Sequence, residues 1–209
     1  MRIGDNVRQR KDGRYEARYY RSRDENGRII YGYAYGKTYE EAAAKREEAV
    51  KLMQRPMVMN LLILGAGSHG QEVYEIASSF RMFHKISFLD DNKTGPEILG
   101  KCSEVSKFLD TYPIAIPAVG DNQLRKLWMQ DLEKKGFIIP NLCHSSANVS
   151  GTCQVGTGTV ICAGATIGAM ADIGKGCIID SGAVIERGAK VHDWTWIDCG
   201  QIVTRKDTQ

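Results

Sequence analysis

The chain has 209 residues, of which 43% are hydrophobic and 25% charged, a composition that excludes a disordered or fibrous protein. Its longest nearly apolar run, residues 58–66, is less than half of the roughly 20 residues that a membrane-spanning helix needs, and no apolar signal segment follows the basic start. We therefore expect a globular cytoplasmic protein without membrane contact. The net charge of +3 is unevenly placed, because residues 1–55 hold 14 Lys or Arg against 9 Asp or Glu whereas residues 56–209 hold 14 against 16.

Residues 1–55 predict three short antiparallel strands followed by a helix. An Asp-Gly turn at residues 11–14 separates two extended runs, and a second turn at residues 24–27 precedes a run that ends at Tyr35. Thr38 and Glu41 fit a capping box, and apolar residues then recur at helical spacing until Pro56.

The alternation of side chains along these strands predicts a sheet with an apolar side and a cationic side. In the second strand, tyrosines and Ala17 alternate with charged residues. We expect the helix to cover the apolar side and the arginines to face solvent. One face of the third strand carries Ile29, Tyr31, Tyr33 and Tyr35.

A small sheet with arginines on its open face can enter a DNA major groove, where guanidinium groups reach phosphates and guanine edges. The segment resembles the arm-type DNA-binding domain of tyrosine-type phage and transposon integrases, in residues 8–19, 31–33 and 36–42. The resemblance covers residues 3–54 and implies DNA as a partner of residues 1–55, but no strand transfer, because the recombinase catalytic domain is absent. The alternative is that the arginines only solvate an exposed sheet. The residues assigned to DNA are Arg8, Arg10, Arg14, Arg18, Tyr20 and Arg21.

Residues 57–140 predict a Rossmann-like βαβαβα lobe. An apolar strand over residues 59–64 runs into the glycine-rich segment 65–70, and a helix follows. Further strands are expected over residues 85–89 and 114–119, and a second helix is marked by Leu124, Leu127, Trp128 and Leu132.

The glycine-rich segment permits a tight turn, and free amides at the helix start attract phosphate, although a purely structural turn is the alternative. A single mononucleotide-binding half is small for a dinucleotide, so a nucleoside diphosphate sugar fits better than NAD. The candidate nucleotide-sugar ligands are Gly65, Gly67, Ser68, His69, Gly70, Asp90, Asp91, Gly120, Asp121 and Asn122.

From residue 149 onward, Val or Ile stands at every sixth position up to Val203. A period of six excludes helical amphipathicity. Small side chains precede most of these positions by two residues, and glycines recur for the corners. The pattern predicts a left-handed parallel β-helix of triangular section over residues 141–209, with a β-sandwich as the alternative. Such prisms commonly pack in threes, so we expect a homotrimer through the β-helix.

Six cysteines are spread singly, with no Cys-x-x-Cys pair and no cluster of histidines. This spacing signals neither a disulfide framework nor a zinc site, so we expect reduced, buried thiols and no metal. The residues are Cys102, Cys143, Cys153, Cys162, Cys177 and Cys199.

The order of motifs over residues 59–203 resembles the sugar O-acyltransferases that include sialic acid O-acetyltransferases and bacillosamine-pathway N-acetyltransferases. The motifs are residues 65–70, 88–91, 120–125 and 141–147, followed by the hexapeptides. The resemblance implies that the Rossmann-like lobe holds a UDP-sugar or related sugar and that the β-helix holds acetyl-coenzyme A.

In that family a histidine at the position of Arg187 acts as general base, and a second histidine, associated with the thioester, stands at the position of Trp196. Arginine keeps its proton at physiological pH and cannot take the first role. His192 is a candidate for a relocated base, the alternative being a solvated corner residue. His69 is expected to contact substrate rather than to transfer protons. The repeat is also shorter than in the family, so part of the surface for coenzyme A is expected to be missing.

Three functions remain open at this point. The first is an acetyl-coenzyme A-dependent acetyltransferase for a nucleotide sugar or sialic acid, weakened or inactive because the expected base is replaced. The second is a non-catalytic DNA-binding regulator that senses a nucleotide sugar. The third is a fusion made by a mobile element that kept neither activity.

Overall fold

The computed structural model describes residues 6–24, 28–54 and 59–208. It forms two compact units, Met1–Met57 and Val58–Gln209, and each is described by itself. The turn expected at residues 25–27 and the helix-ending Pro56 lie outside the described residues. Within the described ranges, no helix combines the length and the apolar composition that crossing a membrane requires.

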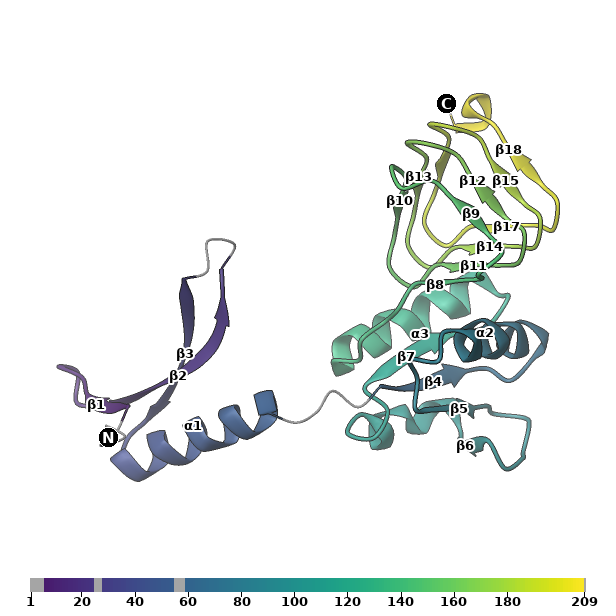
Figure 1. Ribbon diagram of the computed structural model, residues 1–209. Helices are drawn as coiled ribbons and strands as arrows, with labels where there is room; N and C mark the ends of the chain where they lie inside the picture. Colours follow the sequence, from purple (N-terminus) through teal and green to yellow (C-terminus); the bar gives the residue numbers. More distant parts are fainter. Residues whose placement is uncertain (1–5, 25–27, 55–58, 209) are drawn as a thin grey trace. The chain divides into compact units, whose positions relative to one another are not determined.

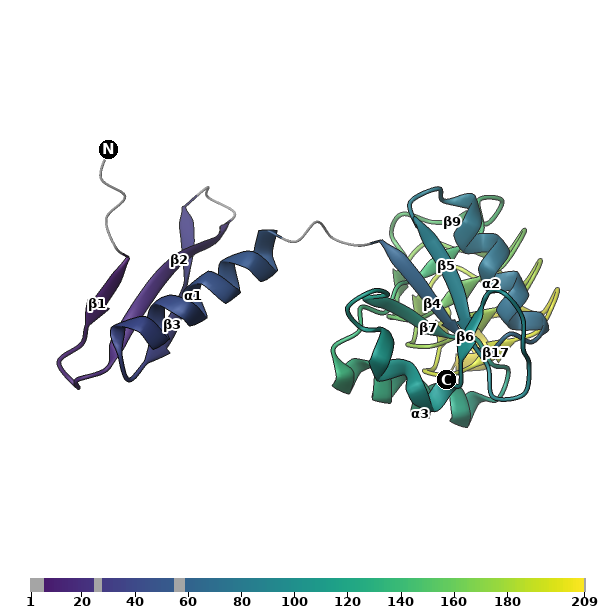
Figure 2. The same ribbon diagram turned by 90° about the horizontal axis from the view of Figure 1, so that it is seen from below.

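The first unit is a three-stranded antiparallel sheet with one helix along one face (Figures 1 and 2). The helix begins as expected, because Thr38 Oγ1 accepts a hydrogen bond from the Glu41 amide at 3.2 Å. Glu41 Oε2 accepts from the Lys37 amide, one residue earlier than a capping box requires. The elements are β1 (Val7–Gln9), β2 (Tyr15–Arg23), β3 (Ile29–Gly36) and α1 (Tyr39–Gln54).

The open face of this sheet carries arginines and tyrosines together, so the expected separation into an apolar and a cationic side is wrong. Arg18 of β2 lies opposite Tyr33 of β3, and opposite residues of an antiparallel pair share a face. The covered face uses small side chains instead: Ala17 is fully buried, and the Tyr19 ring lies over Gly32, where a Cβ would come within 2.4 Å of it. The strand-3 residues that are exposed rather than covered are Ile29, Tyr31, Tyr33 and Tyr35.

The second unit contains the expected Rossmann-like sheet, which is parallel with strand order β6-β5-β4-β7. A short strand and a 3-10 helix between β5 and β7 were not expected from the sequence. The elements are β4 (Asn60–Leu64), α2 (Ser68–Ser79), β5 (Lys85–Leu89), β6 (Ile98–Gly100), η1 (Cys102–Phe108), β7 (Ile114–Pro117) and α3 (Asn122–Lys135).

Alternate side chains of β4 supply two hydrophobic cores, one on each face of the sheet. Leu61 and Ile63 pack in a cluster with Val73 and Ile76 of α2. The same cluster includes Leu142, Val160 and Cys162 of the β-helix, so the two modules share one core (Figure 1). On the other face, a second cluster includes Leu62, Leu64, Val105 and Leu132. The predicted division near residue 140 therefore falls inside one compact unit.

The hexapeptide segment forms a parallel β-helix of eleven two-residue strands arranged in three sheets. Each strand pairs with the strand 18 residues onward, as in the register of Ile161 with Ile179, so three hexapeptides make one coil. The helix starts one rung earlier than expected, with Cys143 opposite Ile161. The strands are β8 (Leu142–Cys143), β9 (Asn148–Val149), β10 (Gln154–Val155), β11 (Val160–Ile161), β12 (Thr166–Ile167), β13 (Asp172–Ile173), β14 (Ile178–Ile179), β15 (Val184–Ile185), β16 (Lys190–Val191), β17 (Trp196–Ile197) and β18 (Ile202–Val203), and η2 (Arg205–Thr208) follows.

The interior of the β-helix is built as predicted from the sixth-position aliphatics and the small residues two positions before them. The corners recur in the left-handed backbone region, mostly at glycine. Two corners depart from glycine, because Met170 and Trp194 adopt φ values of 58° and 65°. The Trp194 ring lies on Gly176, where a Cβ would come within 2.4 Å of it.

Replacing an interior aliphatic should cost far more stability than replacing an outward one of the same type. Ile179 is fully buried, whereas Ile202 is 63% exposed. We expect Ile179→Ala to lower the free energy of unfolding by about 2–4 kcal/mol and Ile202→Ala by less than about 0.5 kcal/mol. Urea unfolding followed by tryptophan fluorescence tests this, because all three tryptophans lie in the second unit. Equal losses would contradict the inward stacking.

Candidate functional site

A cavity of about 380 Å³ lies where β4, β5 and β7 of the Rossmann-like sheet end. In open parallel sheets this is the edge where ligands bind, next to the strand from which the connections run in opposite directions. The β-helix contributes one wall through Trp196. The expected ligands that line the cavity are Gly65, Gly67, Ser68, His69, Asp90, Asp91 and Gly120, whereas Gly70, Asp121 and Asn122 do not.

The glycine-rich segment is shaped by close backbone contacts. Gly65 has φ +102°, and a Cβ there would lie 2.8 Å from the Ala118 carbonyl oxygen. A Cβ on Gly70 would lie 2.0 Å from the Gly65 carbonyl oxygen, so this glycine permits the turn rather than facing the cavity. Gly67 has open space around it and precedes α2, whose first amides have no partner within the helix. These amides can receive a phosphate.

The carboxylates after β5 are committed to the backbone. Asp90 Oδ2 accepts from the Ala66 amide at 2.7 Å, and Oδ1 accepts from the Asn92 and Lys93 amides. Burial opposes ionisation of Asp90, but these amides and the Lys93 charge outweigh it and hold its pKa below the ordinary value. Asp91 accepts from the Cys102 amide at 3.0 Å. The role expected for both residues at a ribose remains a prediction.

The loop after β7 is likewise used structurally. Asp121 caps α3 by accepting from the Leu124 amide at 2.8 Å. Gly120 lies beneath the Trp196 ring, where a Cβ would come within 2.6 Å of it. Burial raises the pKa of the Cys102 thiol to about 12, so this cavity residue is no thiolate nucleophile.

Arg125 of α3 joins the Rossmann-like lobe to the β-helix, and the sequence analysis missed it. Its side chain is buried, with only 1% of the residue exposed. The guanidinium donates to the Val119 and Gly120 carbonyls at 3.0 and 3.1 Å. It also donates to the carbonyls of Gly176 at 2.7 Å and Trp194 at 2.9 Å, both in β-helix corners. These bonds fix the β-helix wall of the cavity. The expected apolar face of α3 is partly wrong, since Leu127 is 61% exposed.

His69 stands in the cavity wall at the start of α2, with its side chain 9% exposed. Its Nδ1 lies 3.4 Å from Glu72 Oε2, one helical turn along the same face. This three-residue spacing is visible in the sequence and could have identified the pair. Glu72 also approaches two β-helix residues, Cys162 and Asp180, and one potential metal-ligand atom from each of the three lies within 4.8 Å of the others. Burial raises the pKa of the Cys162 thiol, which disfavours the thiolate that a metal would need.

The other histidine and arginine candidates lie elsewhere. Arg187 is exposed and does not line the cavity beside α2. His192 is exposed at a corner after β16 and lines a separate, open hollow together with Asp172 and Lys190. Neither residue is brought near the glycine-rich segment as part of this cavity wall.

On the first unit, the expected DNA contacts are all exposed, but carboxylates partner several of them. Arg8 and Arg10 both reach Glu16, at 2.8 and 2.7 Å, and Arg14 lies 2.8 Å from Asp12. The hydrogen bond from Arg10, together with Arg8, holds the pKa of Glu16 below its ordinary value. Arg21 sits where the β2–β3 register shifts, between Tyr20 and Ser22.

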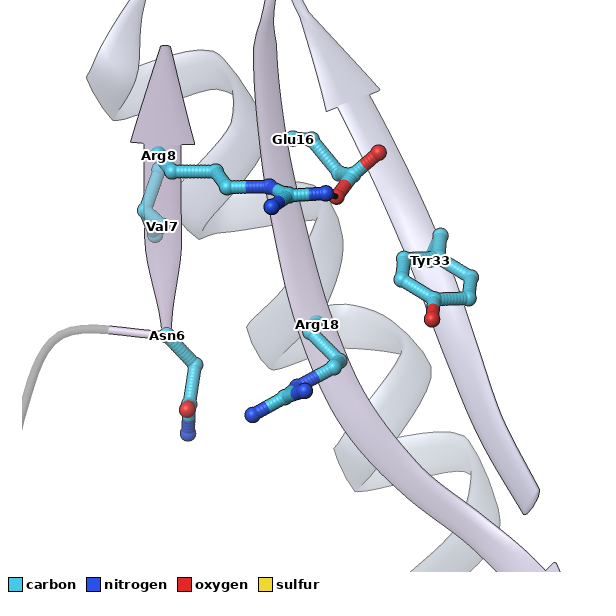
Figure 3. Close-up of a pocket in the computed structure, with 6 residues that line it drawn as sticks. All are labelled: Asn6, Val7, Arg8, Glu16, Arg18 and Tyr33. Atoms are coloured by element: carbon cyan, nitrogen blue, oxygen red, sulfur yellow. Dashed lines mark hydrogen bonds and ion pairs between the residues drawn. The ribbon is translucent and has the colours of Figure 1, made fainter. Parts of the chain in front are cut away.

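A hollow of about 240 Å³ opens on this face between β1, β2 and β3. Figure 3 shows Arg8 extended toward Glu16, while Asn6 and Arg18 project beside one another and the Tyr33 ring rises from β3. The Arg18 guanidinium also lies 4.4 Å from the centre of the Tyr31 ring. Amide, guanidinium and phenol groups are thus offered together, next to a carboxylate that is already paired.

The Asp90 contacts predict a pH-dependent contribution to stability. A carboxylate whose pKa is lowered by folding stabilises the folded state above its unfolded value, and this stabilisation is lost as the pH falls through the folded value. We expect Asp90→Asn to cost about 1–2 kcal/mol at pH 7 and less near pH 3. Urea unfolding at both pH values measures the difference. A cost that does not change with pH would contradict an ionised Asp90.

Comparisons with known proteins address the second unit. Residues 60–132 match the PglD N-terminal domain family. No curated protein matches the chain. The acetyltransferase domain of PglB from Neisseria gonorrhoeae, solved in complex with acetyl coenzyme A, is similar with a TM-score of 0.65 and 27% identity, over 69% of this chain and 72% of that one.

Two further solved structures share the fold at lower identity. A mutant of perosamine N-acetyltransferase from Caulobacter crescentus, in complex with CoA and GDP-perosamine, has a TM-score of 0.60 and 21% identity, over 70% of this chain and 89% of that one. WeeI from Acinetobacter baumannii has a TM-score of 0.62 and 16% identity, over 70% and 72% of the two chains. Together, the PglD N-terminal domain match and the acetyltransferase structures support a relationship of this chain to the sugar acetyltransferases.

Proposed function

We propose that the second unit binds a nucleotide sugar in the cavity beside α2 and transfers an acetyl group to that sugar from acetyl-coenzyme A. The observation that carries the proposal is the cavity itself, which joins a glycine-rich helix start to a β-helix wall. Its volume of about 380 Å³ falls in the range of small-molecule sites. Support for the acetyl donor comes from the PglB acetyltransferase domain, which was solved with acetyl coenzyme A.

The α2 start suits the diphosphate of such a ligand. Gly67 leaves open space at the helix start, and the helix dipole adds positive potential there. UDP-sugars and GDP-sugars share this diphosphate, so the site distinguishes them through other contacts. The replacement of the expected base by Arg187 leads us to expect slower turnover than a sugar acetyltransferase with that histidine would show.

A charge placed at the α2 start tests the binding mode. We expect Ser68→Asp to weaken nucleotide-sugar binding by at least about 10-fold, because its carboxylate opposes the phosphates. Ser78→Asp, an exposed change near the other end of the same helix, should alter binding less than about 3-fold. Calorimetric titration with UDP-sugars and GDP-sugars gives the affinities, and release of the coenzyme A thiol gives the transfer rate. Tight binding by Ser68→Asp would argue against this diphosphate position.

A second candidate function is DNA binding by the first unit, independent of the transfer reaction. The supporting observation is the open sheet face on which exposed arginines alternate with exposed tyrosines. Guanidinium groups can contact phosphates and base edges, while tyrosines add hydrogen bonds and stacking. Because Arg8, Arg10 and Arg14 already have carboxylate partners, Arg18 is the arginine on which we place most of the contact.

Salt dependence distinguishes DNA contact from simple solvation of the sheet. We expect the affinity of the full chain for duplex DNA to fall linearly with log salt, and Arg18→Ala to reduce the slope by about 1. Lys45→Gln, a change on the covering helix α1, should leave the slope unchanged. Fluorescence anisotropy of labelled DNA at several salt concentrations measures both. A slope that Arg18→Ala leaves intact would count against this face.

A further inference from the structure

His69 holds an unused nitrogen in the wall of the cavity. Among the described residues, only two buried side-chain polar atoms have no hydrogen-bond partner, Asn60 Oδ1 and His69 Nε2. The His69 side chain is 9% exposed, and the residue lines the cavity. A buried nitrogen without a partner is unfavourable, and a ligand in the cavity that donates a hydrogen to it would remove that penalty.

The second nitrogen of the same ring determines what Nε2 can do. His69 Nδ1 lies 3.4 Å from Glu72 Oε2. The hydrogen bond with His69 lowers the pKa of Glu72, so the carboxylate is ionised and can only accept. Nδ1 of the neutral ring therefore carries the hydrogen, and Nε2 carries the free lone pair. This is the arrangement in which a carboxylate orients a histidine for proton transfer.

The β-helix holds this pair in place. Ser181 Oγ donates to Glu72 Oε1 at 3.5 Å, and the Cys162 thiol also bonds Glu72. Trp196 Nε1 donates to Asp180 Oδ2 at 3.3 Å, and the Trp196 ring centre lies 6.4 Å from that of His69. The pair is thus fixed from both modules at the junction that the proposed acceptor sugar would occupy.

We propose that His69 Nε2 is the proton acceptor for acetyl transfer in this chain, with Glu72 as its positioning residue; the proposal rests on the proposed function. It gives His69 a chemical role beyond the substrate contact expected from the sequence. It also accounts for a base in a chain that has Arg187 and Trp196 where histidines were expected.

The step balances with the two substrates alone. The amine or hydroxyl of the sugar attacks the thioester carbonyl carbon of acetyl-coenzyme A, and a new C–N or C–O bond forms as the C–S bond breaks. The proton of the nucleophile moves to His69 Nε2. His69 then returns this proton to the thiolate sulfur, so the products are the acetylated sugar and free coenzyme A.

Steady-state kinetics of the full chain test the proposal with matched histidine variants. We expect His69→Asn to lower kcat by about 10²–10⁴-fold, with KM for the nucleotide sugar changed less than about 3-fold. Glu72→Gln should lower kcat by a smaller factor. His84→Asn serves as the control, because His84 is exposed and does not line the cavity, and it should leave both constants unchanged. Thermal unfolding of each variant reports on folding.

Nitrogen-15 NMR of the histidine rings gives a readout that needs no turnover. We expect His69 of the unsubstituted chain to be neutral, with the hydrogen on Nδ1, and Glu72→Gln to shift this signal. A hydrogen on Nε2 would overturn the proposal even if a variant fails to fold. A higher KM with unchanged kcat in His69→Asn would also overturn it, leaving a binding role. If the unsubstituted chain binds nucleotide sugars but releases no coenzyme A, the proposed function fails and the proposal with it.

Discussion

The arrangement of the second unit depends on one buried guanidinium. Arg125 projects from α3 and donates to backbone carbonyls of the β7–α3 loop and of two β-helix corners. Burial of a charge is unfavourable, and Arg125 is accommodated because oxygen atoms from both modules surround it. Removing it would leave several carbonyls without a donor in the interior. The same bonds hold Trp196 over Gly120, and therefore fix the distance between the glycine-rich segment and the β-helix wall.

Periodic features of the second unit could be predicted from sequence because each follows from a local steric rule. The sixth-position aliphatics predicted the β-helix interior, and the glycine-rich segment after an apolar strand predicted the start of α2. The left hand of the coil and the homotrimer remain predictions. Arg125 could not be predicted, since a charged residue on an amphipathic helix ordinarily marks the solvent face, and only the carbonyls of segments far along the chain make its burial favourable.

The first unit illustrates a different limit. Alternation along β2 and β3 predicted two unlike faces, but it did not say which face the helix covers. The helix packs on Ala17 and Gly36, where small residues let it approach closely, and so the tyrosines of β3 remain in solvent beside the arginines. A large aromatic side chain is therefore a poor indicator of the covered face when small residues alternate with it. In the cavity, the sequence placed His69 correctly, but its orientation by Glu72 emerged only from the helix geometry.

The coil length of 18 residues restricts how this protein can change in evolution. An insertion of 18 residues before β17 would add a complete turn and return every later side chain to its own sheet. An insertion of six would keep the aliphatic interior intact yet advance each later strand by one side of the triangle. Trp196 would then leave the sheet that adjoins the Rossmann-like lobe, although the prism itself would remain well packed. Length variation is thus quantised, with one permitted step for function and a threefold smaller one for folding alone.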